Sequence, residues 1–285
     1  MDISLIITTY NWPEALKLTL VSVLNQSVRP GEIIIADDGS GPETGMVIKE
    51  VLDTSDSTWC HVRHDNSGIR QARIKNLAVR YSHAQYLVLI DHDVVLHPDF
   101  IADHLAMARE GTFLQGKRVF LSEYLTKKYL SDFSFSPPSP FSRGLNNRKN
   151  AFRLRLLGKM ITRPKDFQTI LRGCNLSMHR EDFLRVDGYD ETFDQLWGRE
   201  DSDICYRLFH SGVKIRNLWF SALQYHLEHK VIKKKDRDRL DDELDRICEE
   251  KRTRAIKGFS QLSREGEIVG CSDSYYKQAA GEAGE

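Results

Sequence analysis

The 285-residue chain is poor in cysteine, and the cysteines that it has follow no recognisable pattern. They are scattered, odd in number and without a Cys-x-x-Cys pair: Cys60, Cys174, Cys205, Cys248 and Cys271. This scatter argues against a disulfide framework and against a structural zinc site. It fits a protein of a reducing compartment.

The chain also lacks an excess of either charge and any long apolar run. Lys plus Arg and Asp plus Glu both number 41, so no net field attracts the chain to nucleic acid. No apolar run approaches the length that spans a bilayer. The apolar residues 3–7 are too few for a signal region and follow no basic segment. We therefore expect a cytoplasmic protein without a nucleic-acid partner, for which peripheral contact with the cytoplasmic membrane face stays open.

Apolar runs and helical patterns alternate in the first third of the chain. The runs, each short enough for a strand, cover residues 4–8, 32–36, 60–64 and 86–90. Helical spacing covers the segments between them, at residues 13–26, 43–53 and 70–81. This alternation predicts an α/β fold, a mainly parallel sheet flanked by helices with its ligand-binding loops at the carboxyl ends of the strands.

We expect one catalytic domain in two halves, followed by a tail. Residues 1–100 form the nucleotide-binding half and residues 101–230 the acceptor-binding half, with one strand expected over residues 112–120. A charged helical tail covers residues 231–285, with an exposed helix over 233–254 and fraying beyond residue 262, where apolar groups are few.

A loop insertion at residues 131–165 interrupts the second half. Its first part is rich in Ser, Pro, Asn and Arg, and a long loop inside a domain is typically functional or disordered. Residues 152–161 then place Leu154, Leu157 and Ile161 among arginines and a lysine. This pattern is that of an ordinary surface helix or of a helix resting on anionic lipid headgroups.

The sequence Asp91-His92-Asp93 directly follows the apolar run at residues 86–90. Alternate residues of an extended chain point the same way, so the two carboxylates can face one point. Hard oxygen donors of this kind suit a divalent cation that also holds a diphosphate. A solvated turn is the alternative, because so short a motif often matches by chance.

A second acidic cluster, Asp37-Asp38-Gly39-Ser40, follows the run at residues 32–36. Turns of this composition are common and structural. Next to the Thr8-Thr9-Tyr10-Asn11 turn, however, it can form a nucleotide pocket, in which a carboxylate accepts from a base N–H and an aromatic ring stacks on the base.

A third acidic cluster, Trp197-Gly198-Arg199-Glu200-Asp201-Ser202-Asp203, precedes an apolar helix. Helix capping alone accounts for acidic residues at this place. It does not require the Trp-Gly pair, and one of the carboxylates can act as a general base over a substrate hydroxyl.

Taken in order, the motifs of this chain resemble those of the GT-A type nucleotide-sugar glycosyltransferases, and of glycosyltransferase family 2 in particular. The resemblance covers most of residues 3–230. Its elements are Thr8-Thr9-Tyr10-Asn11, Asp37-Asp38-Gly39-Ser40, Asn66-Ser67-Gly68 with Ala72-Arg73, Asp91-His92-Asp93, Gly173-Cys174-Asn175 and Glu200-Asp201. Residues 188–203 also resemble the galactosyltransferase-type carboxyl half of chondroitin-type polymerases, which carry a Trp-Gly-x-Glu-Asp stretch.

The resemblance implies a GT-A (Rossmann-like) fold and a nucleotide and metal site. Thr8 and Tyr10 line the uracil and ribose site, and Asp38 accepts from the base. Arg73 lies near the diphosphate or the base. Asp91 and Asp93 match the metal motif, with Asp93 the direct ligand of Mn²⁺ or Mg²⁺.

The resemblance implies further roles in the second half of the chain. Asp201 matches the catalytic base and Glu200 its partner for acceptor hydroxyls. The floor of the sugar or acceptor site is formed by Trp197, Gly198 and Asn175. His226 completes the metal shell, with His229 as a close competitor, and an imidazole ligand favours Mn²⁺ over Mg²⁺. The chain departs from the family pattern at His92, between the two acids, and at Ser202, where relatives keep a third acid.

The function implied is an inverting, metal-dependent transfer of a hexosyl or N-acetylhexosaminyl group. The donor is a UDP-sugar, and the acceptor is a hydroxyl of a glycan or glycolipid in surface polysaccharide or lipopolysaccharide synthesis. One alternative is a sugar-phosphate nucleotidyltransferase, although residues 8–13 lack the Gly-rich basic loop that such an enzyme needs. Another is an inactive carbohydrate-binding subunit of the same fold.

Overall fold

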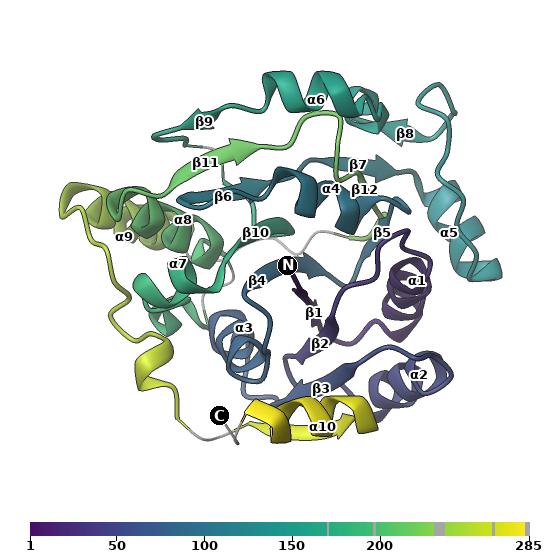
Figure 1. Ribbon diagram of the computed structural model, residues 1–285, viewed down its shortest axis with the longest axis horizontal. Coiled ribbons are helices and arrows are strands. Elements are labelled where there is room, and N and C mark those ends of the chain that lie inside the picture. Colours follow the sequence, from purple (N-terminus) through teal and green to yellow (C-terminus); the bar gives the residue numbers. More distant parts are fainter. Residues whose placement is uncertain (170, 196–197, 231–236, 264–265, 283–285) are drawn as a thin grey trace.

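A nine-stranded sheet forms the centre of the computed structural model, with strand order β13-β3-β2-β1-β4-β10-β6-β11-β9 (Figure 1). The structure describes residues 1–169, 171–195, 198–230, 237–263 and 266–282. The strands are, in that order, Glu267–Cys271, Trp59–Arg63, Glu32–Asp37, Ile3–Thr9, Tyr86–Asp91, Asn175–His179, Thr112–Gln115, Lys214–Asn217 and Pro164–Lys165. Strands β3, β2, β1 and β4 pair in parallel, whereas β10 is antiparallel to both β4 and β6. The sheet is therefore mainly parallel, as the alternating pattern predicts.

Helices cover both faces of this sheet because its central strands are apolar on both sides. In β1, Ile6 packs into one core while Leu5 and Ile7 pack into the other. One face is covered by α1 (Pro13–Leu24), α2 (Pro42–Leu52) and α4 (Phe100–Met107). The other is covered by α3 (Gln71–Arg80), α7 (Arg180–Arg185), α8 (Glu200–His210) and α9 (Arg237–Glu249).

A second, four-stranded sheet lies beside the first and has its own core. Its order is β5-β12-β7-β8, formed by Val94–Leu96, Gln224–His226, Arg118–Leu121 and Leu145–Asn146. Helix α5 (Glu123–Asp132) packs against it. The single strand expected over residues 112–120 is wrong, because the chain leaves the large sheet after β6 and enters the small one as β7. The pairing of β12 with β5 sets His226 opposite Val94, next to Asp93.

The insertion at residues 131–165 contains more regular structure than a loop. It holds β8, a 3₁₀ turn at Arg148–Ala151, and α6 (Arg155–Ile161) before β9. The helix expected over residues 152–161 is confirmed in α6. None of the described helices combines the length and the apolarity needed to cross a bilayer.

The carboxyl-terminal segment is part of the fold, and the expectation that it frays is wrong. Strand β13 extends the edge of the large sheet beyond β3, and α10 (Asp273–Glu282) follows it. The Tyr275 side chain is 3% exposed and its hydroxyl donates to the Tyr81 carbonyl at 2.7 Å. Few apolar residues are needed to order this segment, because β13 pairs with β3 at an edge of the sheet that already exists.

Helix α9 is less exposed than its charge suggests. Leu240, Leu244 and Ile247 form one buried stripe against the core under α8. Their spacing of four and three residues places them on one side of the helix, so the charged residues occupy the other.

Cys60 on β3 and Cys271 on β13 form a disulfide. The scatter of the cysteines, which argues against a disulfide framework, does not predict this pair. The sequence gives no sign of the pair because 211 residues separate its members. Only the return of the chain as β13 brings them together.

Candidate active site

One carboxylate and two imidazoles converge where β4 ends and β12 ends. The Asp93 Oδ2 atom lies 3.3 Å from His226 Nε2 and 3.0 Å from His229 Nε2. One ligand atom from each of the three residues lies within 4.8 Å of the others. The two imidazole rings stack with their centroids 5.2 Å apart. The structure thus brings His226 and His229 to Asp93 together, rather than one in place of the other.

This cluster has the electronic character of a transition-metal site. Asp93 Oδ1 is buried and has no hydrogen-bond partner among the residues that the structure describes. The Nδ1 atoms of His226 and His229 face the Leu227 and Lys230 carbonyls at 2.7 and 3.2 Å. An N–H donated there allows each Nε2 to present its lone pair to a cation that Asp93 also binds. One carboxylate with two imidazoles can hold a divalent metal ion.

Charge within the cluster shifts its pKa values. Burial opposes ionisation of Asp93, but the His229 hydrogen bond and the nearby His226 hold the pKa of the carboxyl below its usual value. The same hydrogen bond raises the pKa of His229, whereas burial lowers that of His226. Asp93 is thus an anion that requires a cationic partner.

Asp91 occupies the neighbouring position at the end of β4. Its Oδ1 accepts a hydrogen bond from Thr8 Oγ1 at 3.1 Å, and Thr8 lies opposite it on β1. Burial, and then the charge of Asp93, raises the pKa of Asp91, while Lys75 acts in the opposite direction. The expectation that Asp91 and Asp93 lie near one another is met, although Asp91 is paired with Thr8 and only Asp93 contacts the imidazoles.

The loops after β1 and β2 form the next part of the same sheet edge. Tyr10 is 46% exposed, and its hydroxyl accepts from Asn66 Nδ2 at 3.1 Å. Asp38 accepts from the Arg70 backbone N–H at 3.2 Å and contacts His64 Nε2 at 2.6 Å. The exposed ring of Tyr10 and the carboxylate of Asp38 therefore lie on neighbouring loops, where the carboxyl ends of parallel strands meet.

Gly39 allows these loops to meet. Its φ of +87° favours glycine, and a Cβ atom would lie 2.7 Å from the backbone of Asn66. Any side chain here would push the loop after β3 away from Asp38.

Arg73 lies on α3, three residues after Arg70, and the two arginines line one pocket. Its guanidinium lies 2.8 Å from Ser263 Oγ and 3.5 Å from a carboxylate oxygen of Glu191. The structure therefore shows Arg73 joining α3 to the carboxyl-terminal segment. The role of Arg73 near the diphosphate or the base stays a prediction.

A buried lysine that belongs to none of the sequence motifs forms ion pairs with Glu200 and Asp201 of the third acidic cluster. Lys75 of α3 is 3% exposed, and its Nζ lies 2.8 Å from Asp201 Oδ1 and 3.0 Å from Glu200 Oε1. It also lies 4.8 Å from the centroid of the Tyr189 ring. Burial opposes its charge, but Asp201 and Glu200 raise its pKa well above the usual value. A lysine between Ile74 and Leu77, which are both buried, is the one sequence signal that could have identified it.

Asp201 and Glu200 begin α8 and differ in accessibility. The Glu200 side chain is 7% exposed and that of Asp201 is 25% exposed. The pKa of Glu200 is raised, and burial is the main cause. Asp201 is therefore the member of the pair that a substrate hydroxyl can reach.

The residues before α8 set the direction of these carboxylates. Gly198 and Arg199 have φ values of +109° and +78°, so the chain reverses directly before Glu200. Trp197 lies outside the described residues. Gly173 packs against the Asp201 carboxylate so closely that a Cβ atom there would overlap it.

Asn175 lies beneath the site. It is 1% exposed, its amide donates to the Ala222 carbonyl at 3.1 Å, and its Oδ1 lies 3.0 Å from His104 Nε2. Its side chain supports the floor of the site and is not exposed to an acceptor.

A cavity of about 280 Å³ adjoins this floor. It is lined by Gln115, Gly116, Lys117, Gln168, Thr169 and Arg172. Arg172 directly precedes Gly173, which touches Asp201. Burial, followed by the charges of Arg172, Lys165 and Lys149, lowers the pKa of Lys117. The cavity next to Asp201 is therefore rich in cations.

Comparison with known proteins agrees with this arrangement. Residues 4–171 match "Glycosyl transferase family 2", and residues 160–230 match "N-terminal domain of galactosyltransferase". The chain is 25% identical to chondroitin synthase of Escherichia coli over 79% of this chain and 34% of the synthase. It is 24% identical to hyaluronan synthase of Pasteurella multocida over 80% and 25% of the two chains. The chain thus spans about a third or less of these two relatives.

A relative of more similar length is the UDP-Glc:alpha-D-GlcNAc-diphosphoundecaprenol beta-1,3-glucosyltransferase WfaP of Escherichia coli. It is 27% identical over 75% of this chain and 73% of its own.

Two solved structures share the fold. TarS of S. aureus, in complex with UDP-GlcNAc, has a TM-score of 0.57 at 15% identity and covers 81% of this chain and 60% of its own. The mannosyltransferase PcManGT of Pyrobaculum calidifontis, in complex with GDP-Man and Mn²⁺, has a TM-score of 0.55 at 17% identity and covers 79% and 56%. The family match spans more than half of the chain and its fold is that of GT-A glycosyltransferases, so this chain belongs to glycosyl transferase family 2.

Proposed function

We propose that this chain transfers a hexosyl or N-acetylhexosaminyl group from a UDP-sugar to a hydroxyl of a glycan or glycolipid, with inversion and with a divalent metal. The observation that supports this best is the position of Lys75. It forms ion pairs with Asp201 and Glu200, and its charge also acts on Asp91. Lys75 thus links the partly exposed carboxylate of Asp201 electrostatically to Asp91, which lies two residues before Asp93.

Asp93, His226 and His229 are the residues that would hold Mn²⁺ or Mg²⁺, and the two imidazoles favour Mn²⁺. The bound ion would neutralise charge that develops on the departing diphosphate. The orphaned Asp93 Oδ1 supports this assignment, because a buried anionic oxygen without a partner is costly.

The loops after β1 and β2 would hold the nucleotide. The exposed ring of Tyr10 can stack on uracil, and Asp38 can accept from the base N–H while His64 and the Arg70 backbone orient it. Thr8 would line the ribose side while it keeps Asp91 in place.

Asp201 would act as the general base. It takes the proton of the acceptor hydroxyl as that oxygen bonds to the anomeric carbon, from the face opposite UDP. The bond from that carbon to the UDP oxygen breaks, and UDP leaves with the electron pair. Lys75 holds Asp201 in place through their ion pair, and Glu200 would orient the acceptor hydroxyl.

The cavity beside Asp201 would receive the acceptor. Lys117 and Arg172 suit an acceptor that carries negative charge near the reacting hydroxyl. The similarity to WfaP and to the two synthases supports a diphosphate-linked lipid or an acidic polysaccharide as the acceptor. We therefore assign the chain to surface polysaccharide or lipopolysaccharide assembly.

The test is release of UDP from a panel of UDP-sugars in the presence of Mn²⁺, Mg²⁺ or EDTA, followed by mass spectrometry. Slow release from one donor that EDTA abolishes is the expected result. Release of pyrophosphate from UTP and a sugar phosphate would favour the nucleotidyltransferase alternative. Metal-independent carbohydrate binding without UDP binding would favour the inactive subunit.

A further inference from the structure

The outward side of α6 is apolar. We define the α6 surface by its exposed apolar residues and its basic rim. The apolar residues are Leu154 (46% exposed), Leu156 (79%), Leu157 (40%), Met160 (71%) and Ile161 (42%). The rim is formed by Arg155, Lys159 and Arg163, which are all exposed. Large apolar side chains that cluster on one exposed segment typically mark an interaction surface.

The segment that carries α6 is also the most one-sided part of the chain in charge. Residues 133–165 contain eight Lys and Arg and no Asp or Glu, although the whole chain is balanced at 41 of each sign. The basic residues are Arg143, Arg148, Lys149, Arg153, Arg155, Lys159, Arg163 and Lys165. A surface with this charge favours an anionic partner.

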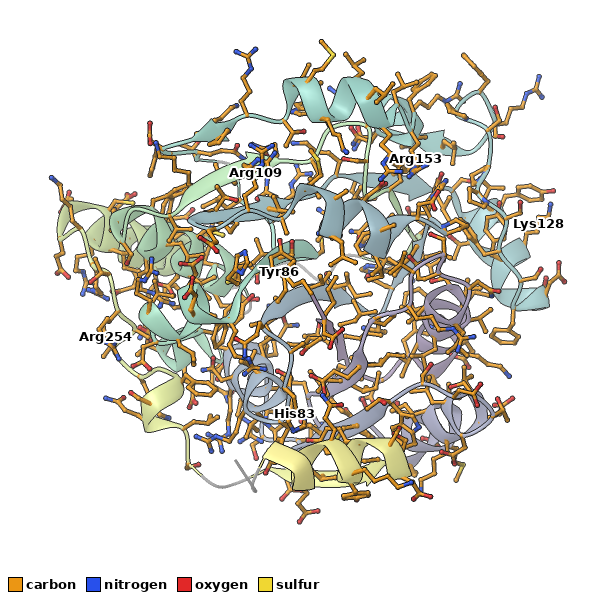
Figure 2. The ribbon with its side chains drawn as sticks, viewed as in Figure 1. His83, Tyr86, Arg109, Lys128, Arg153 and Arg254 are labelled. Atoms are coloured by element: carbon orange, nitrogen blue, oxygen red, sulfur yellow. A yellow bond between two sulfur atoms is a disulfide. The ribbon has the colours of Figure 1, made fainter. Side chains whose placement is uncertain are left out.

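The way α6 packs against the domain leaves its apolar side exposed. Its inner side is close-packed: Gly158 contacts the Trp219 carbonyl, and the Leu154 N–H donates to the Phe220 carbonyl at 3.0 Å. Figure 2 shows the side chains of α6 projecting away from the body of the molecule. The helix is held against the domain, so its apolar side faces outward.

Arg153 helps to hold α6 against the domain and is not part of the α6 surface. Its guanidinium forms ion pairs with Asp103 at 2.8 Å and with Asp99 at 3.0 Å, both at α4 (Figure 2). Arg155, Lys159 and Arg163 are therefore the cations left to meet a partner.

We propose that the α6 surface docks on a bilayer that contains anionic phospholipid. The leucines, the isoleucine and Met160 enter the headgroup and acyl boundary, while the basic rim contacts phosphate groups. A second copy of this chain fits less well, because a two-fold contact would bring the same basic segment against itself.

Docking at α6 would also place the cationic cavity near the membrane. Trp219 contacts both elements, through its carbonyl at Gly158 and its ring, which lies 4.6 Å from Lys117 Nζ. A lipid-linked acceptor could then reach Asp201 from the bilayer surface. This last consequence rests on the proposed function, whereas the docking itself does not.

The test is co-sedimentation of the full chain with vesicles of phosphatidylcholine alone or of equal parts phosphatidylcholine and phosphatidylglycerol. We expect binding to the anionic vesicles that weakens as salt rises. Leu156→Ser with Met160→Ser should weaken it by at least about tenfold. Arg155→Gln with Lys159→Gln should weaken it at low salt and flatten its salt dependence.

Matched controls lie on other faces of the molecule. Met46→Ser on α2 removes a methionine that is 67% exposed, and Lys127→Gln with Lys128→Gln removes two exposed lysines of α5. Both should bind like the original chain. Failure of that chain to bind anionic vesicles, or equal binding by all variants, would overturn the proposal. Co-sedimentation does not require transfer, so its result is independent of the proposed function. If the chain releases UDP, the α6 variants should release it in solution at the original rate.

Discussion

At the scale of single residues, the site depends on a cation that no motif contains. Asp91, Asp93 and Asp201 could be predicted because each follows a strand or begins a helix within an ordered set of motifs. Lys75 and His64 could not, because their significance lies in which carboxylates they meet across the fold. Tertiary partners of this kind leave only a faint local signal, such as a charged residue on the buried side of a helix.

Replacement of Lys75 by Met should impair both stability and catalysis. It leaves Glu200 and Asp201 at the start of α8 without their cation, and breaking one side of a buried ion pair costs about 3–5 kcal/mol. We expect the free energy of unfolding, measured by urea denaturation, to fall by this order, and turnover to fall with it. Lys75→Arg should recover stability more than turnover, because the longer guanidinium alters the position of Asp201. A Lys75→Met variant with unchanged turnover would refute the positioning role.

Gly173→Ala should slow transfer without affecting UDP binding. The new Cβ overlaps the Asp201 carboxylate, which must then move. A displacement of this size at a reacting group costs turnover by about a hundredfold. The matched control is Gly45→Ala in α2, where the nearest atom would be His61 Cε1 at 3.9 Å and the gain in helix propensity stabilises by about 1 kcal/mol. Equal turnover in the two variants would contradict the assignment of Asp201.

At the scale of elements, the apolar strands and the helices between them could be predicted, and the short strands could not. β1, β2 and β4 are short apolar runs, so their length and the helical segments between them identify them. β5 and β12 have three residues each, and their pairing depends on contacts more than a hundred residues apart. That pairing brings the histidines to Asp93, so the metal cluster could be predicted only by family resemblance.

The end of β12 and the loop after it should each contribute one metal ligand. His226→Ala and His229→Ala should each weaken binding of Mn²⁺ by about 10- to 100-fold, as measured by electron paramagnetic resonance of the free ion. If only one of the two variants binds Mn²⁺ more weakly, only that imidazole is a ligand of the ion. His97→Ala, outside the cluster, is the control.

Asp194 gives the start of α3 a pH-dependent stability. It accepts from the Ala72 and Arg73 N–H groups at 2.9 and 3.3 Å, yet burial raises its pKa to about 7. The unfolded chain loses this proton at its ordinary, lower pKa. The unfolded state therefore releases the proton first, and the contribution of Asp194 to stability falls as pH rises from about 4 to about 7.

Urea denaturation across this pH range should show the effect. Relative to the original chain, Asp194→Asn should lose less stability as pH rises, because it carries no proton to release. Parallel pH profiles for the two proteins would contradict the raised pKa.

At the scale of the whole molecule, the proposals rest on three features. These are the cluster of Asp93, His226 and His229, the carboxylate of Asp201 with its cationic cavity, and the α6 surface. The first two meet at the carboxyl ends of the parallel strands, where such folds bind ligands. The third is reached from the cavity through Trp219. In the proposals made above, these features are separate places for the donor, the acceptor and a membrane.

The most direct test of this account compares Asp93→Ala and Asp201→Asn in two measurements, calorimetric binding of UDP with Mn²⁺ and turnover of the UDP-sugar identified from the panel. Asp93→Ala should lose metal-dependent UDP binding. Asp201→Asn should keep it while turnover falls by about a hundred- to ten-thousand-fold. Loss of UDP binding in Asp201→Asn, or full turnover in it, would contradict the assignment of the base and with it the proposed mechanism.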